Sequence, residues 1–214
     1  MCQRYTDQTL TIDDRVEDLL GRMRLDEKLA QLGCVWSTQL VEDDQFSEAK
    51  ARELLADGTG HITRIGASTG LRPAESAAFM NRIQRWLGEN TRLGIPAIVH
   101  EESTAGFTAR DATQFPQAIG LAATWEPGLV EAMGEVIREQ MLAVGARHTL
   151  APVLDVTRDP RWGRTVETYG ECPYLASRLG VAYVRGVQGP DLAGGVVATG
   201  KHFLGYGMSE GGLN

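Results

Sequence analysis

The stretch Gly195-Val196-Val197-Ala198-Thr199-Gly200-Lys201-His202-Phe203 is an apolar run that leads into a lysine and a histidine, followed by a phenylalanine. The chain shows the same arrangement twice before it. An apolar run over 148–156 leads into the charged segment 158–164, and another over 97–101 leads to Glu102. Cations, hydrogen-bond donors and a carboxylate at successive strand ends suit a hydroxyl-rich ligand better than a protein core.

Working outward from these runs, the chain alternates strands with helices. Further strands are expected over 34–36 and 61–65, and helices over 47–56, 73–87, 127–144 and 173–188. This alternation is typical of βαβ units and a parallel sheet. Residue patterning is compatible with two arrangements of the sheet: an open doubly wound sheet, or a (β/α)8 barrel, which usually takes ~250 residues. The fold class is α/β with about five βα units, one domain that we expect to be part of a larger fold.

Apolar spacing predicts the faces of the helices. Residues 1–30 are expected to form a helical lead-in, with Thr11 as the cap of its first helix. The apolar residues at helical spacing there are Val16, Leu19, Leu20 and Met23. In the long helix that opens at Pro127, the expected buried stripe is Leu129, Val130, Met133, Ile137, Met141 and Val144.

Composition excludes several classes of protein. The chain has 214 residues, 43% of them hydrophobic, and a net charge of −7, which disfavours binding to nucleic acid or anionic membranes. Cys2, Cys34 and Cys172 are too few and too far apart for a disulfide framework or a zinc site. The first seven residues lack a signal-peptide pattern, and no apolar run reaches membrane length. A soluble, cytoplasmic protein is the expectation.

Two cofactor motifs begin in the sequence and fail. The run His100-Glu101-Glu102-Ser103-Thr104 starts like a metalloprotease helix, but a threonine stands where the second histidine is needed. Residues 195–201 match the start of a phosphate-binding loop, but His202 replaces the serine or threonine that binds Mg²⁺. We therefore expect no metal and no cofactor.

Several longer motifs resemble glycoside hydrolase family 3, the family of many β-glucosidases and β-xylosidases. The resemblance covers nearly everything from Asp13 to Asn214 and rests on motifs in the family's order. These are Asp26-Glu27-Lys28 with Gln31-Leu32, Phe115-Pro116-Gln117-Ala118 through Ala123-Thr124-Trp125, Ala151-Pro152-Val153-Leu154-Asp155-Val156, Arg158 to Arg164 with Glu167 and Tyr169-Gly170-Glu171, and Lys201-His202-Phe203.

The resemblance implies hydrolysis of β-linked glucosides or xylosides with retention, by a (β/α)8-like barrel and a following α/β sandwich. It implies that Glu102, Arg164, Lys201 and His202 grip the hydroxyls of the sugar in the −1 subsite. The family nucleophile lies in a later Ser-Asp-aromatic segment, and the sandwich commonly supplies the acid/base. Neither is expected within these 214 residues. Residues 1–214 would thus be the N-terminal part of the barrel, with no catalytic residue of its own.

Departures from the family pattern refine these expectations. Ala105-Gly106 stands where many members have His-Gly, and Cys172 stands where an aspartate usually caps the helix at Pro173. Glu102 replaces the aspartate of many glucosidases and reaches one methylene further, which favours pentosides slightly. Ser209-Glu210-Gly211-Gly212 follows Lys-His-Phe in place of an Asp-Ser-His loop, which disfavours the N-acetylglucosaminidase branch.

Three interpretations stay open. The chain is part of a β-glycosidase, with little turnover alone; or half of a split enzyme completed by a second polypeptide; or a non-catalytic module that binds a sugar or a partner. The substrate would be a β-linked oligosaccharide or glycoside, and the missing C-terminal half a candidate partner.

Two structural expectations accompany these interpretations. Consecutive strand residues point to opposite faces, so only one of Glu101 and Glu102 faces inward. Lys201 and His202 are assigned to one sugar, so we expect a cis peptide or a similar distortion beside His202. The strands near 34–36 and ending at Phe203 should form the two edges of the sheet.

Overall fold

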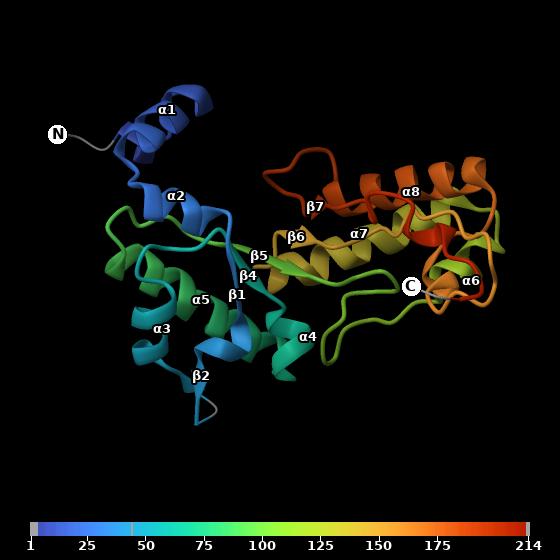
Figure 1. Cartoon of the computed structure of the whole chain (residues 1–214), viewed down its shortest axis with the longest axis horizontal. Helices are drawn as coiled ribbons and strands as arrows, with labels where there is room; N and C mark the ends of the chain where they lie inside the picture. The colour runs from blue at the N-terminus through green and yellow to red at the C-terminus, as the bar shows by residue number, and fades with distance from the viewer. Residues whose placement is uncertain (1–3, 44, 213–214) are drawn as a thin grey trace. The chain divides into compact units, whose positions relative to one another are not determined.

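The computed structural model describes residues 4–43 and 45–212 (Figure 1). Cys2 and Asn214, named above, lie outside these residues. The chain forms two compact units: the first comprises residues 1–62 and 82–97, and the second comprises residues 63–81 and 98–214. In the part of the chain that the structure describes, no helix combines the length and apolar character needed to span a membrane.

Helices and strands alternate as the sequence pattern predicted. The helices are α1 (Ile12–Arg22), α2 (Leu25–Gln31), α3 (Glu48–Leu54), α4 (Ile65–Thr69), α5 (Pro73–Asn90), α6 (Ala118–Ala122), α7 (Pro127–Ala143) and α8 (Pro173–Gln188). The strands are β1 (Cys34–Trp36), β2 (Val41–Glu42), β3 (Gln45–Phe46), β4 (His61–Thr63), β5 (Ile98–Glu101), β6 (His148–Thr149) and β7 (Val197–Ala198). The hairpin β2–β3 and the short helix α4 had no counterpart in the predicted pattern.

A five-stranded parallel sheet has the order β1-β4-β5-β6-β7. Along this order, each strand comes later in the sequence than the strand before it, which is the order that successive βα units produce. In the second unit, His100 of β5 pairs with His148 of β6, which pairs with Val197 of β7. The α/β class is confirmed, and β1 and β7 end the strand order, as expected of the two edge strands.

Three predicted strands are shorter than expected, and the strand expected to end at Phe203 forms only β7, which ends at Ala198. The apolar run over 148–156 forms only β6, because Pro152 has no N–H to donate to the ladder. Pairing resumes further on as a single parallel bridge between Val153 and Lys201. The predicted strand 61–65 likewise ends at Thr63, because α4 begins at Ile65.

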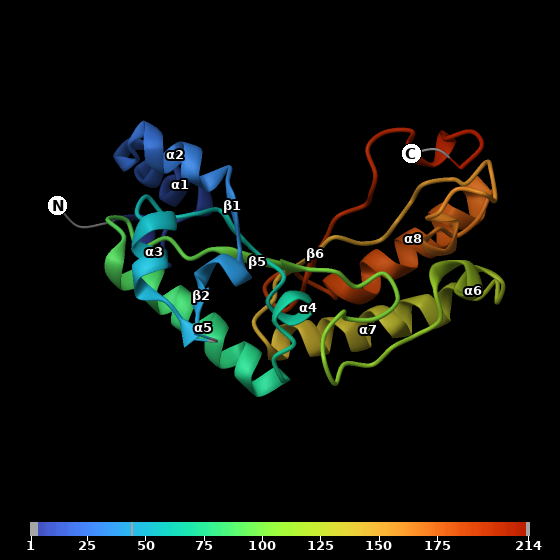
Figure 2. The ribbon, with the colours of Figure 1, turned by 60° about the horizontal axis from the view of Figure 1, so that its bottom comes forward.

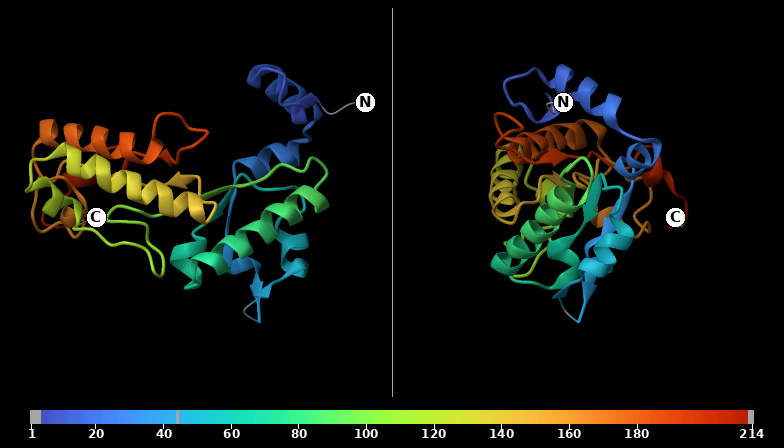
Figure 3. Two further views of the ribbon diagram at one scale, coloured as in Figure 1. Left: turned by 180° about the vertical axis from the view of Figure 1, so that it is seen from behind. Right: turned by 90° about the vertical axis from the view of Figure 1, so that its left-hand side faces the viewer.

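The core of the second unit lies where α7 packs along α8 (Figures 1, 2 and 3). A Cβ on Gly186 would lie 2.3 Å from the carbonyl oxygen of Glu131, so only glycine allows this close approach. Most of the predicted α7 stripe is buried, with Val130, Ile137 and Met141 at 0% exposure. Leu129 is the exception at 55% exposure, and its prediction as a buried residue was wrong.

In the first unit, the hydroxyl of Thr11 caps α1 as expected and accepts a hydrogen bond from the N–H of Asp14 (3.2 Å). No residue of α1 is buried, so the apolar residues that share one face of this helix do not form part of a core. The first turn of α2 is fixed by Glu27, which accepts from the backbone N–H of Arg24 and forms an ion pair with Arg92. This ion pair, together with its hydrogen bonds, lowers the pKa of Glu27 to about 2.

The missing cap of α8 gives a first prediction. Cys172 is the N-cap residue and makes no side-chain capping hydrogen bond, while Pro173 occupies the first turn. We expect Cys172→Asp to raise the free energy of unfolding by ~1 kcal/mol, because a carboxylate there can accept from the next free N–H groups. Urea unfolding measures the change. Cys172→Ala, which cannot cap, is the control, and an equal gain in both variants would contradict capping as the cause.

Candidate functional site

Glu102, Arg164, Lys201 and His202 all lie in the second unit, where the chain leaves neighbouring strands. Glu102 follows β5 directly, Arg164 lies in the loop after β6, and Lys201 and His202 follow β7. The carboxyl ends of parallel strands meet at one edge of a sheet, which is where α/β folds place their ligand sites. The structure brings these predicted residues together as two directly bonded pairs.

The first pair joins Glu102 to Lys201. One carboxylate oxygen of Glu102 accepts from Nζ of Lys201 at 2.9 Å, and the other accepts from Nη2 of Arg64 at 2.6 Å. The side chains of Glu102 and Lys201 are 21% and 13% exposed. Glu102 is therefore fixed at both oxygens, and sequence reasoning had not singled out Arg64.

The second pair joins His202 to Arg164. Nη1 of Arg164 lies 2.9 Å from Nε2 of His202, and Nδ1 of His202 lies 2.7 Å from the buried carboxylate of Asp155. A guanidinium group can only donate, so Nε2 accepts and Nδ1 carries the proton that goes to Asp155. The same Asp155 oxygen accepts from the backbone N–H of His202 at 3.0 Å. Asp155 thus sets both the tautomer and the ring orientation of His202.

Arg164 is held in turn by Glu167. Two parallel bonds join them, from Nε at 2.7 Å and from Nη2 at 2.6 Å. The bonds from Arg164 lower the pKa of Glu167 against the opposing effect of burial, and the charge of Lys201 lowers it further. The same partner raises the pKa of Arg164. A fixed planar donor of this kind suits directional bonds to hydroxyl groups.

Aromatic rings pack against the second pair, His202 and Arg164. The ring of Tyr206 packs edge-on against His202 with centroids 4.8 Å apart, and it meets the buried Trp162 at 5.3 Å in the same way. The guanidinium of Arg164 lies 5.7 Å from the centroid of Tyr206. In the charged loop, Asp159 forms its ion pair with Arg161.

Glu101 and Glu102 point in different directions, as strand alternation predicts. Glu101 is 1% exposed, and its carboxylate accepts from the backbone N–H groups of Gly66 at 2.7 Å and Ala67 at 3.4 Å. Burial raises the pKa of Glu101 to about 7, although these N–H groups act in the opposite direction. The peptide bond between Lys201 and His202 is cis, as expected, and the two side chains reach different partners.

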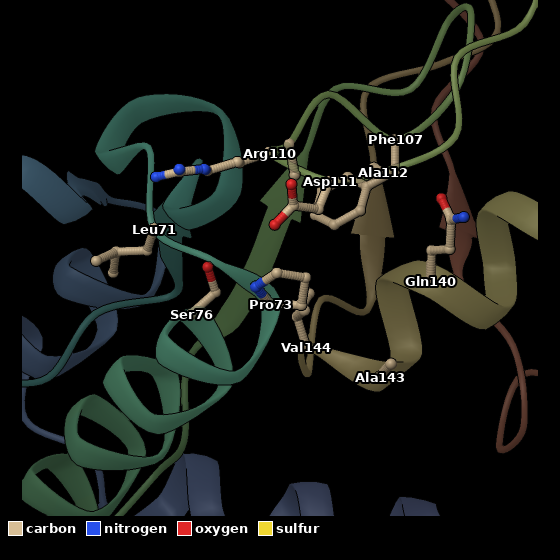
Figure 4. A pocket seen from close by; sticks show the side chains of 11 residues that line it. Leu71, Pro73, Ser76, Phe107, Arg110, Asp111, Ala112, Gln140, Ala143 and Val144 are labelled. Atoms are coloured by element: carbon tan, nitrogen blue, oxygen red, sulfur yellow. The ribbon is translucent and has the colours of Figure 1, made fainter.

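A depression of about 430 Å³ adjoins the cluster and is lined by Asp155, Lys201 and His202 together with apolar residues of 200–208. A second cavity of about 120 Å³ lies at the start of α5, between Phe107, Asp111 and Gln140 (Figure 4). None of the four predicted site residues lines this second cavity, and its volume is below that of ordinary ligand pockets. The polar cluster is therefore the candidate site.

Three residues of this cluster had not been predicted as site residues. Asp155 and Glu167 stood within quoted motifs, so their positions were a usable signal. Arg64 follows a strand in an otherwise apolar stretch, and only the fold brings it to Glu102.

Comparison with known proteins gives the family. The model of the "Glycosyl hydrolase family 3 N terminal domain" matches residues 24–214. A probable β-glucosidase C of Aspergillus flavus is 40% identical over 97% of this chain and 34% of its own length. A periplasmic β-glucosidase/β-xylosidase of Dickeya chrysanthemi is 31% identical, again over 97% of this chain and 34% of its own length.

Solved structures agree. A β-glucosidase from Erythrobacter marinus superposes with a TM-score of 0.89 at 33% identity, over 99% of this chain and 28% of that protein. A Listeria innocua β-glucosidase bound to isofagomine gives a TM-score of 0.76 at 32% identity, over 94% of this chain and 27% of that protein. The chain spans about a third of the curated relatives it matches, and its sheet is part of a TIM-like barrel. It belongs to glycosyl hydrolase family 3, whose N-terminal domain it matches over residues 24–214.

Proposed function

We propose that this chain supplies the sugar-binding half of the −1 subsite in a retaining β-glycosidase that acts on β-linked glucosides or xylosides. The observation that carries the proposal is the paired arrangement of Glu102 with Lys201 and of Arg164 with His202. These four groups occupy one strand-end region of a family 3 chain. Charge-assisted hydrogen bonds are the strong kind, and those to sugar hydroxyls tighten in an oxocarbenium-like transition state.

Each side chain has a distinct hydrogen-bonding role. Ionised Glu102 can only accept, and Lys201 and Arg164 can only donate, so sugar hydroxyls between them are oriented as donors or acceptors. His202 commits its Nδ1 proton to Asp155, and its Nε2, which accepts from Arg164 in this structure, is the atom that can accept from a sugar hydroxyl. This division of roles suits a polyol and gives no reacting group of its own.

The names of relatives support both sugar classes. The Listeria innocua β-glucosidase has been solved with glucose and with laminaribiose, and the Dickeya chrysanthemi relative is named for both glucosidase and xylosidase activity. The longer reach of Glu102 over aspartate favours a sugar without a C6 group. We therefore place β-xylosides slightly ahead of β-glucosides.

We also propose that the remaining part of a family 3 enzyme covers the edge at β7. Phe203 is 98% exposed, Leu204 is 84% exposed and Met208 is 57% exposed, and all three line the depression beside the cluster. Leu154 joins this surface to a groove along the outer side of α8 that Val181 also lines. Further βα units, from the same polypeptide or a second one, would bury these side chains. A sugar- or partner-binding module without chemistry is the remaining candidate, and turnover decides between them.

Sugar binding by the chain itself tests the proposed function. Calorimetric titration with methyl β-D-xyloside and methyl β-D-glucoside is expected to give saturable binding that Lys201→Met weakens at least about 10-fold, because the variant removes a charged donor. Arg161→Met is the control, since Arg161 is an exposed cation of the neighbouring loop that pairs with Asp159. Failure of the wild-type chain to bind both sugars, or equal affinities of the Lys201→Met and Arg161→Met variants, would contradict the proposal.

A further inference from the structure

Arg64 bonds to the same carboxylate as Lys201. Its Nη2 donates to Oε1 of Glu102 at 2.6 Å, while Lys201 donates to Oε2. The Arg64 side chain is 34% exposed, so this ion pair is partly shielded from solvent. One cation on each oxygen stops the carboxylate from rotating, and each oxygen keeps a further lone pair for another donor.

The backbone around Arg64 is built to present this side chain. Arg64 stands between β4 and α4 with φ 51° and ψ 71°, the left-handed conformation that residues other than glycine seldom adopt. Its N–H donates to the carbonyl of His100 at 2.9 Å, which ties it to β5 two residues before Glu102. The hydroxyl of Thr63 also lies 3.0 Å from Nε2 of His100. The chain reverses sharply at this point, and Arg64 stays beside β5.

Buried Glu101 holds the other side of this junction. Its carboxylate accepts from the N–H groups of Gly66 and Ala67, the first turn of the helix that follows Arg64. Gly66 is packed so closely against Phe107 that a Cβ there would lie 2.8 Å from the phenyl ring. The two consecutive glutamates therefore bind different groups. Glu101 accepts from the helix turn that follows Arg64, and Glu102 forms the ion pair with the guanidinium of Arg64.

We propose that Arg64 is a positioning residue that orients Glu102 for sugar recognition, an inference that rests on the proposed function. With both oxygens of Glu102 fixed by cations, their remaining lone pairs accept from two adjacent sugar hydroxyls. The ligand feature selected is thus a vicinal diol in one geometry. Arg64 acts through Glu102, and Glu101 acts through Arg64.

A double-mutant cycle tests whether Arg64 works through Glu102. With methyl β-D-xyloside as the probe, Arg64→Met is expected to weaken binding about 10-fold, the scale of one hydrogen bond to a charged group. In a Glu102→Gln background the same change is expected to cost less than about 2-fold, because the group that Arg64 orients is already altered. Arg64→Lys should recover part of the affinity, since it keeps the charge and loses the planar fork.

Arg72→Met is the matched control, because Arg72 is a nearby exposed arginine that pairs with Asp111 away from the cluster. Thermal melts identify any variant that fails to fold; in that case Arg64→Lys replaces Arg64→Met in the cycle. Wild-type chain that does not bind the sugar would overturn the proposed function itself. Wild-type binding with an unchanged Arg64 variant, or with full additivity in the cycle, would overturn the positioning role alone.

Discussion

A chimera in which this chain replaces the matching N-terminal portion of the Listeria innocua β-glucosidase is expected to hydrolyse aryl β-xylosides or β-glucosides. The 214-residue chain alone is expected to be slower by on the order of 10⁶, the typical cost of removing catalytic groups that act as a unit. The chain contains no Ser-Asp-aromatic segment, where the family resemblance places the nucleophile. The measurement is release of p-nitrophenol under saturating substrate.

Two controls make the turnover result decisive. A chimera that carries Lys201→Met should fold and lose most of its activity, since Lys201 fixes Glu102 and faces the sugar in our proposal. Turnover by the pure chain, abolished by replacement of a carboxylate within it, would show that its own residues carry the chemistry. A folded chimera that binds sugar and hydrolyses neither substrate would favour the module without chemistry.

The second large effect is a pH dependence of stability that Glu101 causes. Burial raises the pKa of Glu101 from 4.5 to about 7, so between these values the folded chain holds a proton that the unfolded chain has released. The free energy of unfolding therefore falls as the pH rises from about 4.5 to 7, by about 3 kcal/mol from this group, and levels off above. Below about 4.5 both states are protonated, so the slope vanishes and the stabilising contribution of this group is fully present.

Urea unfolding at several pH values measures this slope. Glu101→Gln is expected to remove it, because glutamine does not titrate, while Glu89→Gln at an exposed position should leave it unchanged. Glu27 has a lowered pKa of about 2, so its own effect falls below this pH window and has the opposite sign. Equal slopes in wild-type chain and Glu101→Gln would contradict a buried, proton-binding Glu101.

Much of the fold could be predicted from apolar periodicity. The parallel βα order and the faces of α7 followed from the spacing of residues such as Ile137 and Met141, which are buried as predicted. Boundaries failed where one residue overrides a pattern: Pro152 shortens β6, and the tight junction at Arg64 starts a helix inside a predicted strand. Leu129 shares the spacing of its helix stripe and still faces solvent.

Part of the candidate site could likewise be predicted from the sequence, and part could not. The resemblance pointed to Glu102, Arg164, Lys201 and His202 because they stand in motifs, and the roles assigned to them remain predictions. Arg64 could not be predicted in this way, because its position beside Glu102 depends on a left-handed backbone conformation and on a backbone hydrogen bond to β5. Contacts that depend on such tertiary geometry leave no local signal in the chain.

A crystal structure of the chain with methyl β-D-xyloside is the most direct test of the central claim, that the cluster grips the hydroxyls of one sugar. Our account predicts sugar oxygens within about 3 Å of Glu102, Arg164, Lys201 and His202, the ordinary hydrogen-bond distance. It also predicts that two adjacent hydroxyls share the Glu102 carboxylate. A sugar bound in the cavity beside Phe107, or anywhere else with these four side chains untouched, would contradict the account.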